Sequence, residues 1–95
     1  MTILEKRASR EPCSEAGWYA WDYVLDEAID DAFVCALRPL GSFLYLKALA
    51  RPFFKIESDY FILKGVLGDD FFRMAVHGDH RDEMEKLERF VGELR

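Results

Sequence analysis

Four residues near the C-terminus have types and spacing that could do chemistry: His77, Asp79, His80 and Glu83. His80 and Glu83 are three residues apart, so they would lie on one side of a helix. His77, across a turn, could add a third ligand to a small site for a divalent metal. In the simpler interpretation Asp79 caps a helix and both histidines face solvent. We favour this interpretation and predict no required metal site and no cofactor.

The rest of the chain shows no catalytic pattern. No serine lies in a nucleophile elbow, and no glycine-rich loop has phosphate-binding spacing. Asp69 and Asp70 are adjacent carboxylates in a turn, where such pairs are normally solvated. The aromatic residues within 18–23 could line a pocket for a flat ligand, but we expect the two tryptophans to pack in the core. The sequence therefore favours a non-enzymatic protein.

Composition narrows the class of partner. The chain has 95 residues and a net charge of −5, whereas binding to nucleic acid needs a basic stripe. The most apolar region, residues 32–50, is interrupted by Arg38, Pro39, Gly41 and Lys47 and cannot form a membrane span. We therefore expect neither nucleic acid nor membrane as a partner, and expect the protein to bind itself or another protein.

The two cysteines are too few for a disulfide scaffold. Cys35 lies in an apolar context and is predicted to be buried, whereas Cys13 lies in a polar segment and is predicted to be exposed. The N-terminal residues lack the apolar stretch of a secretory signal. These features predict a cytoplasmic protein.

A long N-terminal helix is predicted over residues 18–37. Apolar residues recur there at three- and four-residue steps, which is the period of one helical face. Ser14 is a candidate N-cap, and Pro39 cannot continue a helix. The apolar positions are Trp18, Trp21, Leu25, Ala28, Ile29, Ala32, Ala36 and Leu37.

Either a short helix or a strand is predicted over residues 42–51. Leucine, alanine and lysine favour a helix capped by Ser42, which we prefer, but alternation of apolar residues also allows a strand. Residues 1–12 are polar and without period, so we predict a disordered tail there. We predict a single α+β domain over residues 13–95.

Three strands are predicted in the second half of the chain, over residues 53–57, 60–67 and 71–77, joined as an antiparallel meander. Residues 60–67 could instead form a short helix, but Gly65 disfavours it by about 1 kcal/mol. A C-terminal helix follows, with Asp79 as its N-cap. The predicted fold is thus α+β: a long N-terminal helix, a short helix or strand, a three-stranded meander and a C-terminal helix.

Alternation along the three strands separates two faces. The first is apolar and is predicted to face the helices, through Phe54, Ile56, Phe61, Leu63, Leu67, Phe72, Met74 and Val76. The second mixes aromatic and basic side chains, a composition that is typical of an interface. Its candidate interface residues are Phe53, Lys55, Tyr60, Ile62, Lys64, Phe71 and Arg73. Alternatively, residues 40–50 fold over this second face.

We therefore predict a small acidic, homodimeric protein-interaction module that uses the second face of its sheet. The alternative is a small oligomeric enzyme or ligand-binding protein with an aromatic pocket between helix and sheet. A filled core with an exposed apolar patch would favour the first prediction, and an enclosed pocket with polar groups the second.

Overall fold

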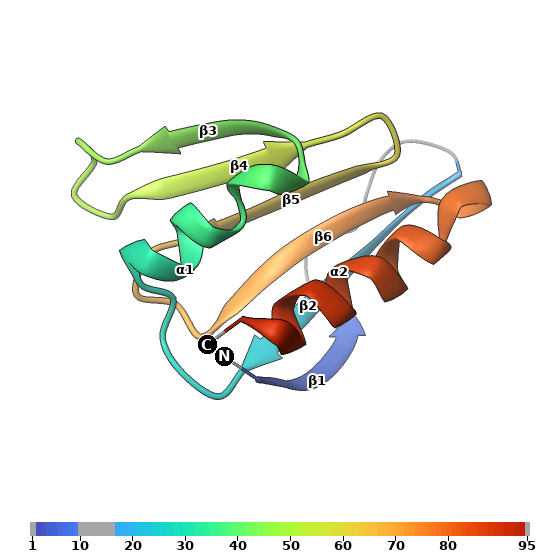
Figure 1. Cartoon of the computed structure of the whole chain (residues 1–95), viewed down its shortest axis with the longest axis horizontal. Helices are drawn as coiled ribbons and strands as arrows, with labels where there is room; N and C mark the ends of the chain where they lie inside the picture. The colour runs from blue at the N-terminus through green and yellow to red at the C-terminus, as the bar shows by residue number, and fades with distance from the viewer. Residues whose placement is uncertain (1, 10–16, 95) are drawn as a thin grey trace.

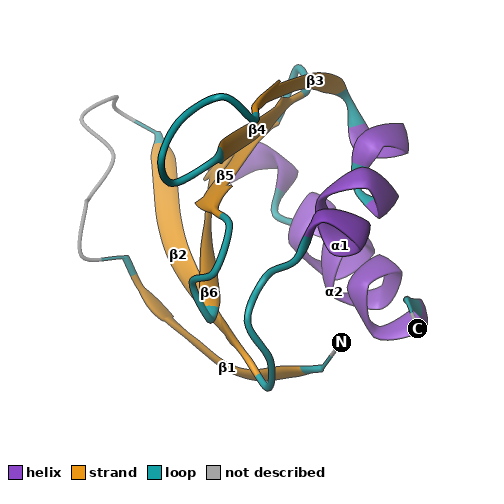
Figure 2. Ribbon diagram, turned by 90° about the vertical axis from the view of Figure 1, so that its left-hand side faces the viewer, coloured by secondary structure: helices purple, strands orange, loops and turns teal. Residues whose placement is uncertain are grey.

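A computed structural model describes residues 2–9 and 17–94, and shows a six-stranded antiparallel sheet with helices on one of its faces (Figures 1 and 2). The sheet order is β1-β2-β6-β5-β4-β3, so β1 and β3 form its two edges. The elements, in chain order, are β1 (Ile3–Ala8), β2 (Trp18–Leu25), α1 (Asp31–Ala36), the 3₁₀ turn η1 (Arg38–Leu40), β3 (Ser42–Leu46), β4 (Phe53–Glu57), β5 (Phe61–Val66), β6 (Phe71–His77), the 3₁₀ turn η2 (Gly78–His80) and α2 (Asp82–Glu93).

The predicted long helix over residues 18–37 is wrong. Its first part is β2, which pairs with β1 on one side and with β6, far along the chain, on the other. Aromatic and β-branched residues in this segment favour a strand, and Tyr23 and Leu25 alternate toward the core, where both are buried. The helix α1 begins only after Asp30, whose carboxylate accepts a hydrogen bond from the Phe33 N–H at 2.8 Å.

The segment predicted as a disordered tail contains β1, which pairs antiparallel with β2 in the register Ala8 opposite Trp21. The hairpin is fixed at both ends, because the Ser9 N–H donates to the Ala20 carbonyl at 3.1 Å and the Asp26 N–H donates to the Thr2 carbonyl at 3.0 Å. Residues 1 and 10–12 of the predicted tail lie outside the described residues.

The predictions for Ser14 as a cap and for Cys13 also fall outside the described residues. Cys35 was predicted to be buried and is exposed. The reason is that α1 is short and turns Phe33 and Val34 toward the core, which leaves Cys35 on its outer side.

Residues 42–46 form β3 and not the helix that we preferred, so the strand alternative is correct for this part. Tyr45 lies opposite Phe54 of β4 and turns toward the helices, whereas Leu44 points to the other face. The Tyr45 hydroxyl donates to the Asp31 carboxylate at 3.0 Å, and the Lys47 ammonium lies 3.2 Å from it. Because β3 extends the sheet, it does not fold over the second face as the alternative expected.

The strands β4, β5 and β6 lie where the sequence predicted them. The predicted three-stranded sheet is wrong, because β3 pairs with β4 and β2 pairs with β6, which gives six strands. Gly65 allows close packing inside β5, because a Cβ atom there would lie 2.8 Å from the Phe54 ring and 3.3 Å from the Phe72 side chain. A glycine within a strand often marks such a close approach. The C-terminal helix is also confirmed, as α2.

The core lies between the helices and the inner face of the sheet (Figure 2). Phe72 is at its centre, stacked on Tyr23 at 5.2 Å and tilted against Phe33 at 6.2 Å between ring centroids. From α2, Met84, Leu87 and Val91 are buried. The eight residues predicted to face the helices do so: seven are buried, and Leu67 is partly buried against the same cluster.

The two faces of β6 can be tested with one pair of variants. Phe72 is 0% exposed and Phe71 is 36% exposed. We expect Phe72→Ala to lower the free energy of unfolding by about 3–5 kcal/mol, since it leaves a cavity in the core. Phe71→Ala should lower it by less than about 1 kcal/mol. Urea denaturation measures both, and equal losses would contradict the assigned faces.

The contact between α1 and β3 predicts a pH dependence. The Tyr45 hydroxyl, and next the Lys47 ammonium, lower the pKa of Asp31 from its ordinary value. Because the folded pKa is below the unfolded one, the stabilisation is present above the unfolded pKa and is lost as the pH falls through the folded pKa. We expect Asp31→Asn to remove this part of the acid-induced loss of stability, followed as melting temperature against pH. Asp59→Asn, in the turn before β5, is the control and should retain it.

Candidate functional site

The four residues of the candidate metal cluster make other contacts in the structure. The His77 ring accepts a hydrogen bond from the Asp79 N–H at 3.2 Å, and so caps η2. Asp79 was predicted to cap the C-terminal helix, but it lies inside η2. The residue before α2 is Arg81, and its side chain makes no cap hydrogen bond.

His80 and Glu83 are also engaged. The His80 ring stacks on Tyr60 with 3.6 Å between centroids, and the Glu83 carboxylate lies 3.2 Å from the Lys86 ammonium. Within residues 2–9 and 17–94, no three histidine, cysteine, aspartate or glutamate side chains are arranged to hold a metal ion.

The predicted interface residues lie mainly on the sheet face opposite the helices. Six of the seven alternate with buried residues along β4, β5 and β6 and point away from the core. Tyr60 is the exception, since it lies in the turn before β5 and is 41% exposed. We call this surface the open face, because no described helix or strand packs on it (Figure 2). Its residues on the five strands β1, β2, β6, β5 and β4 include Arg7, Asp22, Phe71, Arg73, Ile62, Lys64, Val66, Phe53 and Lys55.

Three cations form one row across the open face. The register places Lys55 of β4 directly opposite Lys64 of β5, and Lys64 directly opposite Arg73 of β6. We call these three residues the basic row. Side chains opposite each other on one face have Cβ atoms about 5 Å apart, and like charges in such positions are destabilising. The row is thus an unusual feature in a chain whose net charge is −5.

The row continues into the N-terminal hairpin, where the sequence did not predict a site. Arg73 lies opposite Asp22 of β2, and Asp22 lies opposite Arg7 of β1. Asp22 is only 3% exposed and is the one buried charged residue among those described. Both residues were missed because their segments were predicted as tail and helix. The alternation of Tyr19, Trp21, Tyr23 and Leu25 was the signal that could have placed Asp22 on a sheet.

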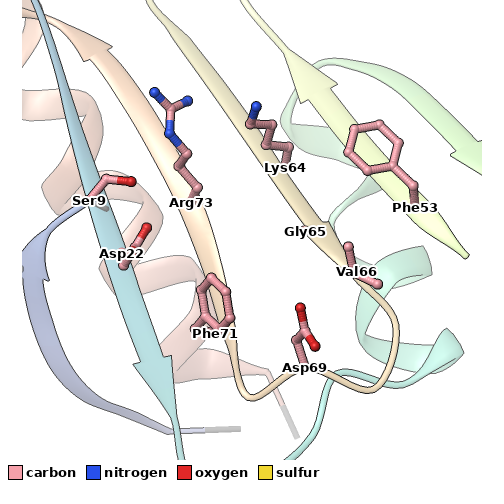
Figure 3. A pocket seen from close by; sticks show the side chains of 9 residues that line it. All are labelled: Ser9, Asp22, Phe53, Lys64, Gly65, Val66, Asp69, Phe71 and Arg73. Carbon is pink, nitrogen blue, oxygen red and sulfur yellow. The ribbon is translucent and has the colours of Figure 1, made fainter. Parts of the chain in front are cut away.

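A cavity of about 340 Å³ lies beside the basic row on the open face. Figure 3 shows the Arg73 and Lys64 side chains next to each other on one side of it, and Phe71 and Val66 toward the other. The carboxylate of Asp69 lies at its margin and forms an ion pair with Arg51. The residues that line it are Ser9, Asp22, Phe53, Lys64, Gly65, Val66, Asp69, Phe71 and Arg73. The cavity therefore combines a polar lining, of two cations and two carboxylates, with an apolar side.

The alternative prediction placed an aromatic pocket between helix and sheet. The large side chains there fill the core, with Tyr23, Phe54 and Phe72 fully buried. Burial, and next the negative charge of Glu88, raise the pKa of the Tyr23 phenol. A hollow of about 210 Å³ opens at the margin, between α2 and the β1–β2 hairpin. In it the Lys6 ammonium lies 4.0 Å from the Glu88 carboxylate.

Comparison with protein-family models, with curated proteins and with solved structures finds no match to this chain. Neither helix within the described residues has the length and hydropathy that crossing a bilayer requires.

Because no related protein is found, the chemistry of the site has to be inferred from its own residues. Two basic side chains, two carboxylates and several apolar groups line the cavity together. The lining includes no histidine and no cysteine, but it does include serine, aspartate and lysine, residue types that can act as a base or a nucleophile.

The contact of the basic row with the buried Asp22 carboxylate can be tested through the free energy of unfolding. Arg73→Met removes the cation directly opposite Asp22, and we expect a loss of about 1–3 kcal/mol in the free energy of unfolding. Lys55→Met is the matched control. Lys55 is partly exposed and lies 3.8 Å from Glu57, so this change should cost less than about 1 kcal/mol. Chemical denaturation measures both, and an unchanged Arg73→Met variant would show that Asp22 does not depend on this cation.

Proposed function

We propose that this protein is a small, non-enzymatic interaction module whose open face binds an acidic segment of another protein. The observation that carries the proposal is the basic row beside an apolar cavity on a chain of negative net charge. Carboxylates of a partner would bind beside the contacts that these side chains already make, of which the 3.8 Å ion pair of Lys55 with Glu57 is one. Charges that match those of a partner set the orientation and specificity of binding.

The partner is inferred from the two sides of the cavity. The basic row spans three adjacent strands, which is about 10 Å, and so fits two or three carboxylates of an extended segment. Phe53, Val66 and Phe71 would contact an apolar side chain of the same segment, as aromatic residues do at the centre of interfaces. The charges would set the orientation and the association rate, and the apolar contact would supply most of the affinity.

The contents of the core support this function over the ligand-binding alternative. A pocket for a small molecule usually buries most of its ligand, whereas the cavity here lies on an open sheet face and the space between helix and sheet is filled. We also propose a cytoplasmic location. The exposed free thiol of Cys35 supports it, because such thiols persist in reducing compartments.

A photo-crosslinking experiment tests the proposed function. An open-face residue, Ile62, is replaced by p-benzoylphenylalanine, and crosslinked proteins are captured from a lysate of the native organism and identified by mass spectrometry. Lys64→Glu in the same chain should remove the captured partner, since it reverses the central charge of the basic row. Lys86→Glu, which reverses an exposed charge on α2, should leave capture unchanged.

Salt and nuclease treatments decide the class of partner. Capture of an acidic protein should weaken as the salt concentration rises, because exposed charges are screened within about 8–10 Å at physiological ionic strength. A crosslinked partner that is equally abundant with Lys64→Glu would contradict the proposal. Loss of capture after nuclease treatment would show that nucleic acid, and not an acidic protein, occupies the row.

A further inference from the structure

The two edges of the sheet differ in how they resist pairing with another strand. The β1 edge carries three successive charged residues, Glu5, Lys6 and Arg7, and its register with β2 shifts between Ile3 and Glu5. Charged side chains and such irregularities are the usual protection of an exposed edge. The β1 edge is therefore protected against pairing.

The β3 edge has none of these features. Its sequence, Ser-Phe-Leu-Tyr-Leu, contains no charged residue and no proline, and its register with β4 is regular over all five residues. Leu44 is 46% exposed and Leu46 is 42% exposed. Among the described residues no strand lies beyond β3 (Figure 1). An edge strand presents a row of unpaired N–H and C=O groups, which is a template for another strand.

We propose that β3 pairs antiparallel with β3 of a second copy of this chain, around a two-fold axis at Leu44. The two sheets would then form one continuous sheet of about twelve strands, that is, two six-stranded halves. This inference rests on the edge strand alone and does not depend on the proposed partner of the open face.

The strand sequence fits its own copy in this register. Leu44 lies opposite Leu44 of the second copy, and Phe43 lies opposite Tyr45 of the second copy on the helix side. Aromatic pairs opposite each other are among the stabilising cross-strand contacts. Lys47 just beyond the strand would meet Gly41 of the second copy, and its ammonium is already 3.2 Å from Asp31 of its own chain. On the helix side Arg38 lies over the Phe43 ring and Lys47 lies over the Tyr45 ring, so the register brings Arg38 of one copy near Lys47 of the other. The Asp31 carboxylate, 3.2 Å from the Lys47 ammonium, lies beside this pair of cations.

The charges of the open face also permit a second copy. Leu44 lies opposite Lys55 in the sheet, so the two basic rows would continue end to end with a pair of leucines between them. The two Lys55 residues would be three strand spacings apart, or about 14 Å. This exceeds the screening length of about 8 Å at physiological ionic strength, so the rows would repel each other only weakly. The exposed Leu44 and Leu46 would be covered at the join.

A disulfide tests the register. In a Cys13→Ser, Cys35→Ser background, Leu44→Cys places two thiols opposite each other across the axis. Residues opposite each other in antiparallel strands have Cα atoms about 4.5–5.5 Å apart, within the range of a disulfide. We expect a crosslinked dimer under mild oxidation. Leu4→Cys, on the β1 edge and 65% exposed in the native chain, should give no crosslinked dimer. Equal crosslinking of both variants would overturn the register.

Sedimentation equilibrium at micromolar concentration tests the association itself. The wild-type chain should be a dimer, and Leu44→Lys should raise its dissociation constant by about 100-fold or more, since it sets two cations opposite each other. Leu4→Lys is the control and should remain a dimer. Unchanged melting curves would show that both variants fold. A monomeric wild-type chain, or a dimer that survives Leu44→Lys, would overturn the proposal. Lys64→Glu should keep the dimer and lose the captured partner, which separates this inference from the proposed function.

Discussion

The pairing of β2 with β6 is the interaction on which the rest of the structure depends. It joins the N-terminal hairpin to the C-terminal meander and so makes one sheet from two separate parts of the chain. On the inner side it stacks Tyr23 on Phe72, the centre of the core. On the outer side it sets Asp22 opposite Arg73. Without this pairing the core would lose one wall, and Arg73 of the basic row would lose the carboxylate that lies opposite it.

One face of the sheet packs against the helices and stabilises the fold, and the other is available for recognition. Both helices cover one face of the sheet, where the apolar residues that alternate along each strand are buried. The other face is left for residues that do not contribute to the core. Lys55, Lys64 and Arg73 lie on that face in adjacent strands. Arg73 lies opposite the Asp22 carboxylate, and the Lys55 ammonium lies 3.8 Å from the Glu57 carboxylate. Charges on a face that does not serve the core are available for recognition.

The open face and the β3 edge are separate surfaces, and the geometry lets both be used together. Pairing at an edge uses backbone groups in the plane of the sheet. The side chains of the open face project perpendicular to that plane. A dimer formed through β3 would therefore leave both cavities accessible and place the two basic rows in one line. A partner with two acidic segments would then bind with a gain in effective concentration, without any new contact within either site.

The sequence by itself determined the elements whose signals are local. Alternation of apolar and polar residues located β4, β5 and β6 and distinguished their buried face from the face that carries Lys64 and Arg73. The apolar stripe of α2 located that helix. Tertiary structure decided the N-terminal half. Trp18, Trp21 and Leu25 fit the helical period, yet their segment is a strand. Its aromatic residues suit a strand, and pairing with β6 and burial against Phe72 stabilise it there. The position of Asp22 beside Arg73 follows from that pairing. No local pattern contains it, because its partner lies at the other end of the chain.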